Sequence, residues 1–482
     1  MLEDIIQERR GKLSQYRKEA DPYPARVKRT IRVKEALGRF SSLTRGRKKV
    51  WLTGRVRAAR DQGGIIFSDL EDESGKMQII LKKGETKEFV LLQKTLATGD
   101  FLEVSGKAMK TKRGEKSILA SHARIIVKSL RPLPDSWCGL EDIETRLRKR
   151  YLDAIMNHEV LELMKKKGVF WETVRTFLRK EGFLEVETPV LESVPGGAET
   201  EPFVTHHNAL DRDFYLRISL ELPLKKMLVA GFEKVFEIGR IFRNEGIDRE
   251  HLQDYTQMEC YWAYADYNDM MRLTEKMCKA IIRNVSGSLT TTHGGKKINW
   301  GKQWKKIDYY GIFKKYNAID LEAASQERLQ ARARELGIAF EPKTGRGRLI
   351  DLIYKKTVRP NLVEPCFLVN PPVMIEPLAK RVPGKPDRVE RFQIVALGTE
   401  LGKGFSELND PEDQLERFKE QMTLRAAGDT EAQMMDEDFI EALEYGMPPA
   451  AGFGVSERLF AILMDKPMRE AVFFPLMKEE KN

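Results

Sequence analysis

The chain has 482 residues and a net charge of +10, with 41% apolar and 32% charged residues. This length predicts two or three domains, and the composition excludes a disordered or collagen-like chain. The sequence has no run of 18 uncharged apolar residues and begins with a charged segment, so we expect a cytoplasmic protein that does not span a membrane. The cysteines are scattered and form no C-x-x-C pair, which indicates reduced, buried thiols rather than disulfides or a zinc site (Cys138, Cys260, Cys278 and Cys366).

Positive charge is concentrated at the start of the chain. Residues 1–140 contain 31 Lys and Arg against 17 Asp and Glu, whereas the remaining residues contain 52 against 56. This distribution suggests that one module binds a polyanion while the other carries out chemistry. A solvated, lysine-rich surface would explain the charge equally well.

Residues 1–45 are predicted to form a basic helical segment that is interrupted at Pro22 and Pro24. Residues 46–130 change to short β-rich runs separated by Gly, Asp and Lys-Arg-Gly turns (residues 50–58, 63–70, 76–81, 101–108 and 118–127). Five short strands in about 80 residues are typical of an OB-fold barrel, which often binds oligonucleotides.

Three side chains of this barrel are candidates for reading single-stranded bases. Phe67 offers a stacking surface, Arg60 a charge for the phosphates, and Gln78 hydrogen bonds to a base edge. Taken alone, Phe67 is more simply explained as a core residue.

Residues 131–144 are rich in proline at their start and are predicted to be a linker. A catalytic domain is expected over residues 145–482, beginning with a long amphipathic helix over residues 156–181. Strand-like segments follow without alternating helices, which predicts an α+β fold with a mostly antiparallel sheet flanked by helices. An insertion is expected at about residues 269–390.

The segment FEIGRIFRNEG, residues 236–246, is the most informative part of the sequence. Its alternation describes a strand that ends near Arg243, and an arginine at a strand end can bind a nucleotide phosphate through two hydrogen bonds. Ordinary salt bridges would explain each residue of the segment but not their order.

This segment resembles motif 2 of the class II aminoacyl-tRNA synthetases, and together with MECYWAYADY it is similar to the lysine-specific members. Residues 184–189 resemble the dimer-forming motif 1, GKGFSELNDPEDQLERF resembles the block before motif 3, and FGVSER is similar to motif 3. The resemblance extends over nearly all of residues 3–478. It implies an antiparallel catalytic sheet, an N-terminal OB-fold anticodon domain, a homodimer, tRNA(Lys) and L-lysine as substrates, and ATP with Mg²⁺.

The resemblance also implies individual roles. Arg243 and Arg458 would be catalytic and bind ATP, with Glu245, His251, Tyr255 and Glu400 as further ATP contacts. The lysine substrate would be bound by a separate set (Gly197, Glu221, Glu259, Tyr261, Lys403, Phe405 and Glu407), magnesium by Glu400 and Glu407, and the anticodon by Arg60, Phe67 and Gln78.

The role of Glu407 also has a physical argument. A buried carboxylate is costly unless a cation matches it, so Glu407 favours a substrate with a side-chain ammonium, to which the Tyr261 hydroxyl adds a hydrogen bond. Glu407 could instead cap the helix that starts near Pro411, although Asp410 is better placed to do so.

The chain departs from the family pattern at three places. Lys403 stands where the family has an asparagine that contacts the substrate carboxylate, Gln393 stands where it has a metal-binding glutamate, and motif 3 is one residue short. Lys403 would either pair with the substrate carboxylate or compete for Glu407.

Three alternatives to a lysine-specific tRNA synthetase are less consistent with the sequence. A paralogue that aminoacylates a protein lysine generally lacks the OB-fold domain, and relatives specific for aspartate or asparagine would fit Tyr261 and Glu407 poorly. A non-catalytic RNA-binding protein is disfavoured because Arg243, Glu400 and Arg458 are retained.

Overall fold

The computed structural model describes residues 2–134, 140–246, 251–341, 344–426, 428 and 432–479. The chain divides into two compact units, Met1–Glu141 and Asp142–Asn482, and each is described by itself. Within the described residues, no helix has both the length and the apolar character needed to cross a membrane. Cys260, Cys278 and Cys366 are buried and free, as predicted, while Cys138 and part of the expected linker lie outside the described residues.

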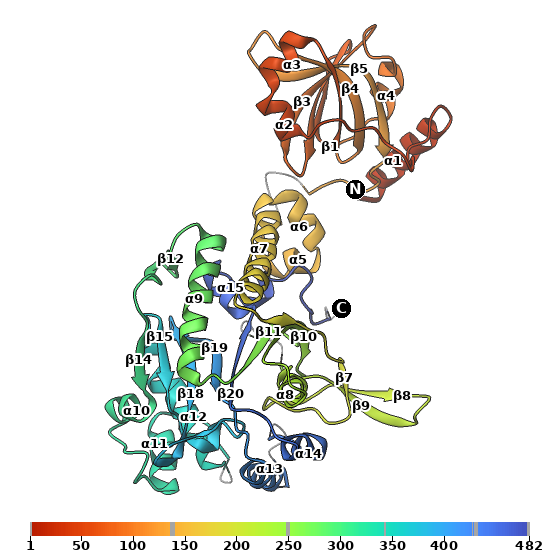
Figure 1. The fold of residues 1–482 in the computed structure, drawn as a ribbon. Coiled ribbons are helices and arrows are strands. Elements are labelled where there is room, and N and C mark those ends of the chain that lie inside the picture. Colours follow the sequence, from red (N-terminus) through yellow and green to blue (C-terminus); the bar gives the residue numbers. More distant parts are fainter. Residues whose placement is uncertain are drawn as a thin grey trace. The chain divides into compact units, whose positions relative to one another are not determined.

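The first unit contains a closed barrel with the strand order β1-β2-β3-β5-β4 (Figure 1). Its strands are β1 (Lys49–Asp61), β2 (Ile65–Asp72), β3 (Gly75–Lys82), β4 (Phe101–Lys110) and β5 (Lys116–Val127). Alternate residues of β2, such as Ile66 and Leu70, are buried in the barrel core, whereas their neighbours are partly exposed. The five predicted strands and the barrel are therefore confirmed.

Helices surround this barrel. They are α1 (Leu2–Arg17), α2 (Val33–Gly38), α3 (Phe40–Gly46) and α4 (Phe89–Thr95). The basic helix α1 is held against the barrel by two buried side chains. Arg9 donates hydrogen bonds to the carbonyl oxygens of Ser129 and Arg131, and the Tyr16 hydroxyl accepts from the backbone N–H of Ile125 at 2.9 Å.

The second unit is built on an eight-stranded sheet with the order β14-β15-β18-β19-β20-β11-β10-β6. These strands are β6 (Leu184–Glu185), β10 (Lys234–Phe242), β11 (Asp254–Ala263), β14 (Lys305–Asp308), β15 (Cys366–Val369), β18 (Arg391–Ala396), β19 (Thr399–Ser406) and β20 (Ala450–Ser456). The central strands are antiparallel, and only the two edge pairs, β14 with β15 and β6 with β10, are parallel. The predicted mostly antiparallel sheet is confirmed.

Smaller sheets complete the second unit. They pair β7 (Leu191–Glu192) and β8 (Val204–His207) with β9 (Arg212–Leu216), β12 (Thr290–His293) with β13 (Lys296–Asn299), and β16 (Arg381–Val382) with β17 (Lys385–Val389).

Helices cover both faces of the large sheet (Figure 1). They are α5 (Ile143–Arg148), α6 (Arg150–Met156), α7 (His158–Lys180), α8 (Glu221–Val229), α9 (Tyr267–Ser286), α10 (Tyr309–Asn317), α11 (Gln326–Glu335), α12 (Arg346–Thr357), α13 (Pro411–Ala426), α14 (Glu437–Glu444) and α15 (Arg458–Leu463). On β11, Met258 and Cys260 pack into the core below α7 and α9, while Tyr261 packs on the opposite face with α8 and α14. The helix predicted over residues 156–181 is α7.

Residues 269–390, expected to be an insertion, are integrated into this unit. Nearly all of α9 lies in this stretch and packs against α7 and the sheet, and β14 and β15 extend the sheet at one edge. The rest forms a core of its own around α10, α11 and α12.

Candidate active site

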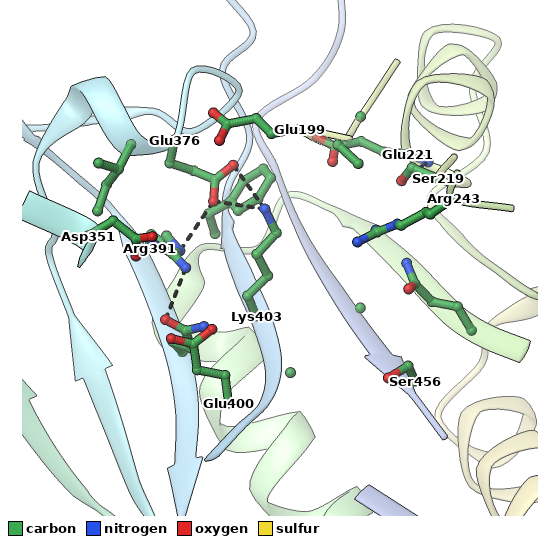
Figure 2. Close-up of a pocket in the computed structure, with 18 of the residues that line it drawn as sticks. Glu199, Ser219, Glu221, Arg243, Asp351, Glu376, Arg391, Glu400, Lys403 and Ser456 are labelled. Atoms are coloured by element: carbon green, nitrogen blue, oxygen red, sulfur yellow. Dashed lines mark hydrogen bonds and ion pairs between the residues drawn. The ribbon is translucent and has the colours of Figure 1, made fainter. Parts of the chain in front are cut away.

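A cavity of about 600 Å³ opens over the central strands of the large sheet (Figure 2). Most of the site residues predicted from the sequence line it, namely Gly197, Glu221, Arg243, Glu245, His251, Tyr255, Glu259, Tyr261, Glu400, Lys403, Phe405 and Arg458. Glu407 is the exception among those assigned to this unit, because it lies behind the cavity wall with only 1% of its surface exposed.

Three glycines of the central strands lie on the floor of the cavity. Gly402 of β19 and Gly452 and Gly454 of β20 line it. A Cβ atom at Gly452 would lie 2.3 Å from Oε1 of Glu407 and 2.5 Å from the ring of Tyr261. Side chains are therefore excluded at this position, and ligands must contact the backbone.

Arg243 follows directly after β10 and points into the cavity (Figure 2). Its backbone N–H donates to the carbonyl oxygen of Gln253 at 2.7 Å, which fixes the chain where the strand ends. Its guanidinium lies 5.6 Å from the centre of the Tyr255 ring, and Glu245 nearby accepts a 2.8 Å hydrogen bond from Thr200. The cation and the aromatic ring are thus close enough to act on one ligand.

Glu221 and Glu259 lie close together on one side of the cavity. Gly197 has a left-handed backbone, φ 83°, and packs so closely on Glu221 and Ser219 that a Cβ atom would lie 2.8 Å from that of Glu221. Glu259 is buried and accepts hydrogen bonds from four groups of the protein, namely the Ser219 hydroxyl, the Leu220 N–H, the Gln257 amide and the Tyr261 hydroxyl.

The Tyr261 hydroxyl, predicted to contact a substrate ammonium, is thus engaged with Glu259 at 2.9 Å. Burial and the carboxylates of Glu221, Glu259 and Glu407 raise the pKa of Tyr261 well above its ordinary value, so the hydroxyl remains a proton donor.

Lys225 is a fully buried residue that the sequence analysis did not identify. Its Nζ lies 2.5 Å from a carboxylate oxygen of Glu221 and 2.5 Å from one of Glu407. Burial raises the pKa of both carboxyls, and Lys225 opposes this shift. Because two carboxyls share one ammonium, a second cation beside them would favour the ionised form of both.

A second ion-pair network lines the opposite wall. Lys403 Nζ donates to both oxygens of Glu376, at 2.9 and 3.2 Å, and Nε of Arg391 lies 3.2 Å from the same carboxylate (Figure 2). Arg391 also donates to Oε1 of Gln393 at 3.0 Å. Burial alone would raise the pKa of Glu376, but Lys403 and Arg391 outweigh it and hold the pKa below its ordinary value. The ion pair with Glu376 accounts for the position of Lys403. Neither the substrate carboxylate nor Glu407, the two partners expected from the sequence, is needed to explain it.

The donors on this wall do not fit a magnesium ion held by several carboxylates of the protein. Glu400 lines the cavity, but Glu407 is buried against Lys225, and the side-chain oxygen of Gln393 already accepts from Arg391. Among the described residues, no group of three His, Cys, Asp or Glu side chains is placed to hold a metal ion.

The three predicted base-reading residues lie on the outer surface of the barrel. Phe67 pairs with Arg60 across β1 and β2, and Gln78 of β3 pairs with Asp69, two residues further along β2. Phe67 is partly exposed and faces away from the buried Ile66 and Ser68. It is therefore not a core residue, and the simpler explanation of Phe67 is wrong.

Local signals could have revealed Lys225 and Glu376. Lys225 follows Glu221 by four residues in a helix, which places both side chains on one face. Glu376 is the single charge in the apolar run VMIEPLA, and an isolated charge in such a run is usually buried with a partner. Their partners, Glu407 and Lys403, are too distant in sequence to be deduced in this way.

The antiparallel sheet, the arginine-containing cavity above it and the separate five-stranded barrel define the architecture of a class II aminoacyl-tRNA synthetase. Comparison with known families agrees, because residues 142–478 match the class II tRNA synthetases (D, K and N) and residues 50–126 match the OB-fold nucleic acid binding domain. The chain belongs to the class II tRNA synthetases of the D, K and N group.

Individual relatives are similar over their whole length. The chain is 44% identical to a lysine–tRNA ligase of Roseiflexus castenholzii, with 99% of each chain covered. It is also 44% identical to one of Carboxydothermus hydrogenoformans, over 99% of this chain and 98% of the relative, and 42% identical to one of Chloroflexus aurantiacus, over 100% and 99%.

Proposed function

We propose that this protein activates lysine with ATP to form lysyl-adenylate and pyrophosphate, and then transfers the lysyl group to the 2′ or 3′ hydroxyl of tRNA(Lys) with release of AMP. The observation that carries the proposal is the separation of charge across the cavity. Arg243 and Lys403 point into the same space from opposite sides, while Glu221 lies towards one end (Figure 2). This arrangement matches the carboxylate and the α-ammonium of one amino acid.

The specificity for lysine is assigned to the group around Glu407. A substrate side chain that passes Tyr261 and Phe405 brings its ammonium towards Glu407, where a second cation beside Lys225 would favour the ionised carboxylate. A neutral or acidic side chain supplies no such cation, and a mismatch of this kind discriminates by factors on the order of 10⁴.

Adenylate formation requires a substrate carboxylate oxygen to attack the α-phosphorus while the bond to the β-phosphate breaks. The nucleophile is already anionic, so the protein needs no general base. Arg243 is assigned to the α-phosphate and the carboxylate, where it stabilises charge as pyrophosphate leaves. Tyr255 and Arg458 are assigned to the two faces of adenine, with Glu245 at its edge and His251 near the outer phosphates.

These assignments do not depend on a protein-held magnesium ion. Glu400 remains the candidate ligand on the cavity wall for a cation that enters with ATP.

Two further parts of the proposal concern partners. Arg60, Phe67 and Gln78 would read the anticodon, supported by their shared outer face on the barrel. A homodimer is supported by exposed apolar side chains at Leu184 and Leu191, in and after the segment that resembles motif 1.

The decisive experiment is ATP–pyrophosphate exchange with each of the twenty amino acids in turn. We expect exchange with lysine alone, followed by charging of tRNA(Lys) when the tRNA is added. Exchange driven by aspartate or asparagine, or no exchange with any amino acid, would refute the proposal.

A further inference from the structure

Glu376 is the centre of the ion-pair network on the cavity wall. Its side chain is only 4% exposed, and it precedes Pro377 in a loop between η2 (Val373–Ile375) and β16. A buried carboxylate with two cationic partners is normally a structural element. Here, however, one partner, Lys403, reaches into the cavity with 42% of its side chain exposed.

The geometry of Lys403 leaves it partly unsatisfied. An ammonium group has three N–H donors, and Glu376 accepts two of them, at 2.9 and 3.2 Å. Glu376 divides its single negative charge between Lys403 and Arg391, so the three side chains together carry one net positive charge. Glu199 lines the same cavity, and burial together with Glu376 raises the pKa of its carboxyl to about 7, so it supplies only part of a negative charge at neutral pH. One donor of Lys403 and part of the positive charge therefore remain for an anion in the cavity.

Pairing with Glu376 fixes the position of the remaining N–H donor of Lys403. A free lysine side chain loses rotamer entropy when it is fixed, and pairing with Glu376 fixes Lys403 before any substrate binds. Figure 2 shows its ammonium on the side of the cavity opposite Arg243. A carboxylate placed between the two would meet a cation on each side.

We propose that Glu376 is a positioning residue for substrate recognition: it holds Lys403 so that Lys403 and Arg243 together bind the carboxylate of the amino acid. This inference rests on the proposed function and adds to it the residue that determines where the second cation stands. Glu376 acts through Lys403 and does not itself touch the substrate.

The test compares lysine with cadaverine, which is lysine without its carboxylate. Binding of each to the full-length protein is measured by calorimetry, together with binding of ATP. Lys403→Met should weaken lysine at least about tenfold, because a charge-assisted hydrogen bond is lost, and change cadaverine and ATP by less than about twofold. Glu376→Gln should weaken lysine in the same selective way.

A double variant distinguishes positioning from general support of the fold. If Glu376 acts through Lys403, the Glu376→Gln/Lys403→Met protein should bind lysine no more weakly than Lys403→Met alone. Asp153→Asn is the matched control, since Asp153 is also a buried carboxylate that pairs with two arginines, Arg146 and Arg150, but does not line the cavity. It should leave the affinities for both ligands unchanged.

Several results would overturn the proposal. Additive losses in the double variant, or equal losses for lysine and cadaverine, would make Glu376 a structural residue. Tighter lysine binding by Glu376→Gln would show that Glu376 withholds Lys403 from the substrate. If the unaltered protein binds neither lysine nor cadaverine, the proposed function fails and this inference fails with it. If the unaltered protein binds lysine and Lys403→Met binds it equally well, the inference alone is refuted.

Discussion

Replacing Lys225 by methionine would remove the ammonium that lies between Glu221 and Glu407. The lysine side chain is fully buried, and its Nζ is 2.5 Å from an oxygen of each carboxylate. Methionine is of similar length and fills the same space, so the change removes mainly the charge. Breaking a buried ion pair by removing one partner costs about 3–5 kcal/mol. We therefore expect Lys225→Met to lower the free energy of unfolding by about 3–5 kcal/mol at pH 8.

The loss should depend on pH in a defined direction. The pKa values of Glu221 and Glu407 are already raised by burial, and removing Lys225 raises them further. Between its unfolded-state pKa of about 4.3 and its raised folded-state pKa, such a carboxyl is protonated in the folded protein but ionised in the unfolded one. The free energy of unfolding therefore falls as the pH rises through this range. If the folded variant binds one proton more than the folded wild-type protein, the loss of unfolding free energy caused by Lys225→Met changes by about 1.4 kcal/mol per pH unit. The cost should be about 2–3 kcal/mol smaller at pH 6 than at pH 8.

Urea unfolding at pH 6 and pH 8, followed by tryptophan fluorescence, measures this effect. Four tryptophans report on the second unit, namely Trp171, Trp262, Trp300 and Trp304. The double variant Lys225→Met/Glu407→Gln should recover part of the loss at pH 8, because it replaces one uncompensated carboxylate by a neutral amide. A loss below about 1 kcal/mol at pH 8, or a larger loss at pH 6, would refute the reasoning.

Three further predictions concern the proposed reaction. Arg243→Ala should slow pyrophosphate exchange by at least about 10²-fold, whereas Arg272→Ala, an exposed arginine on α9, should leave it unchanged; equal rates for the two variants would contradict the role of Arg243. Glu407→Gln should raise the KM for lysine far more than the KM for ATP, and equal increases would identify Glu407 as structural. Phe67→Ala should weaken tRNA binding by about 1–3 kcal/mol without affecting exchange in the absence of tRNA, which filter binding and exchange assays can separate; unchanged tRNA affinity would exclude base stacking on Phe67.

The overall fold could be predicted largely from local patterns. Alternation of apolar residues and the turns between them located the five barrel strands, and the spacing of apolar residues located α7. Both patterns depend on which face of an element is buried, which is a local property of the sequence. The integration of α9, β14 and β15 into the second unit was not predicted, because strand partners such as β15 and β18 are paired by tertiary contacts.

The cavity was predicted less completely than the fold. Arg243 and Arg458 stand in recognisable motifs, and both line the cavity. The charge balance was not predictable, because it depends on pairs such as Lys403 with Glu376 and Lys225 with Glu407, which come together only in the folded chain. Sequence motifs thus located the charged side chains but not the partners that determine how much charge each one offers to a ligand.

The glycine floor of the cavity limits how the specificity of this protein can change. At Gly452 a side chain would collide with Glu407 and Tyr261, and at Gly402 a Cβ atom would lie 2.8 Å from the carbonyl oxygen of Gly454 on the next strand. A side chain is thus excluded at positions 402 and 452, so neither position can be enlarged to exclude a smaller amino acid. A library for a new amino acid substrate would therefore vary positions 225, 261, 405 and 407, which surround the proposed site of the substrate side chain. It would keep Lys403, which is proposed to bind the carboxylate that all amino acids share, and Glu376, which holds Lys403 in place.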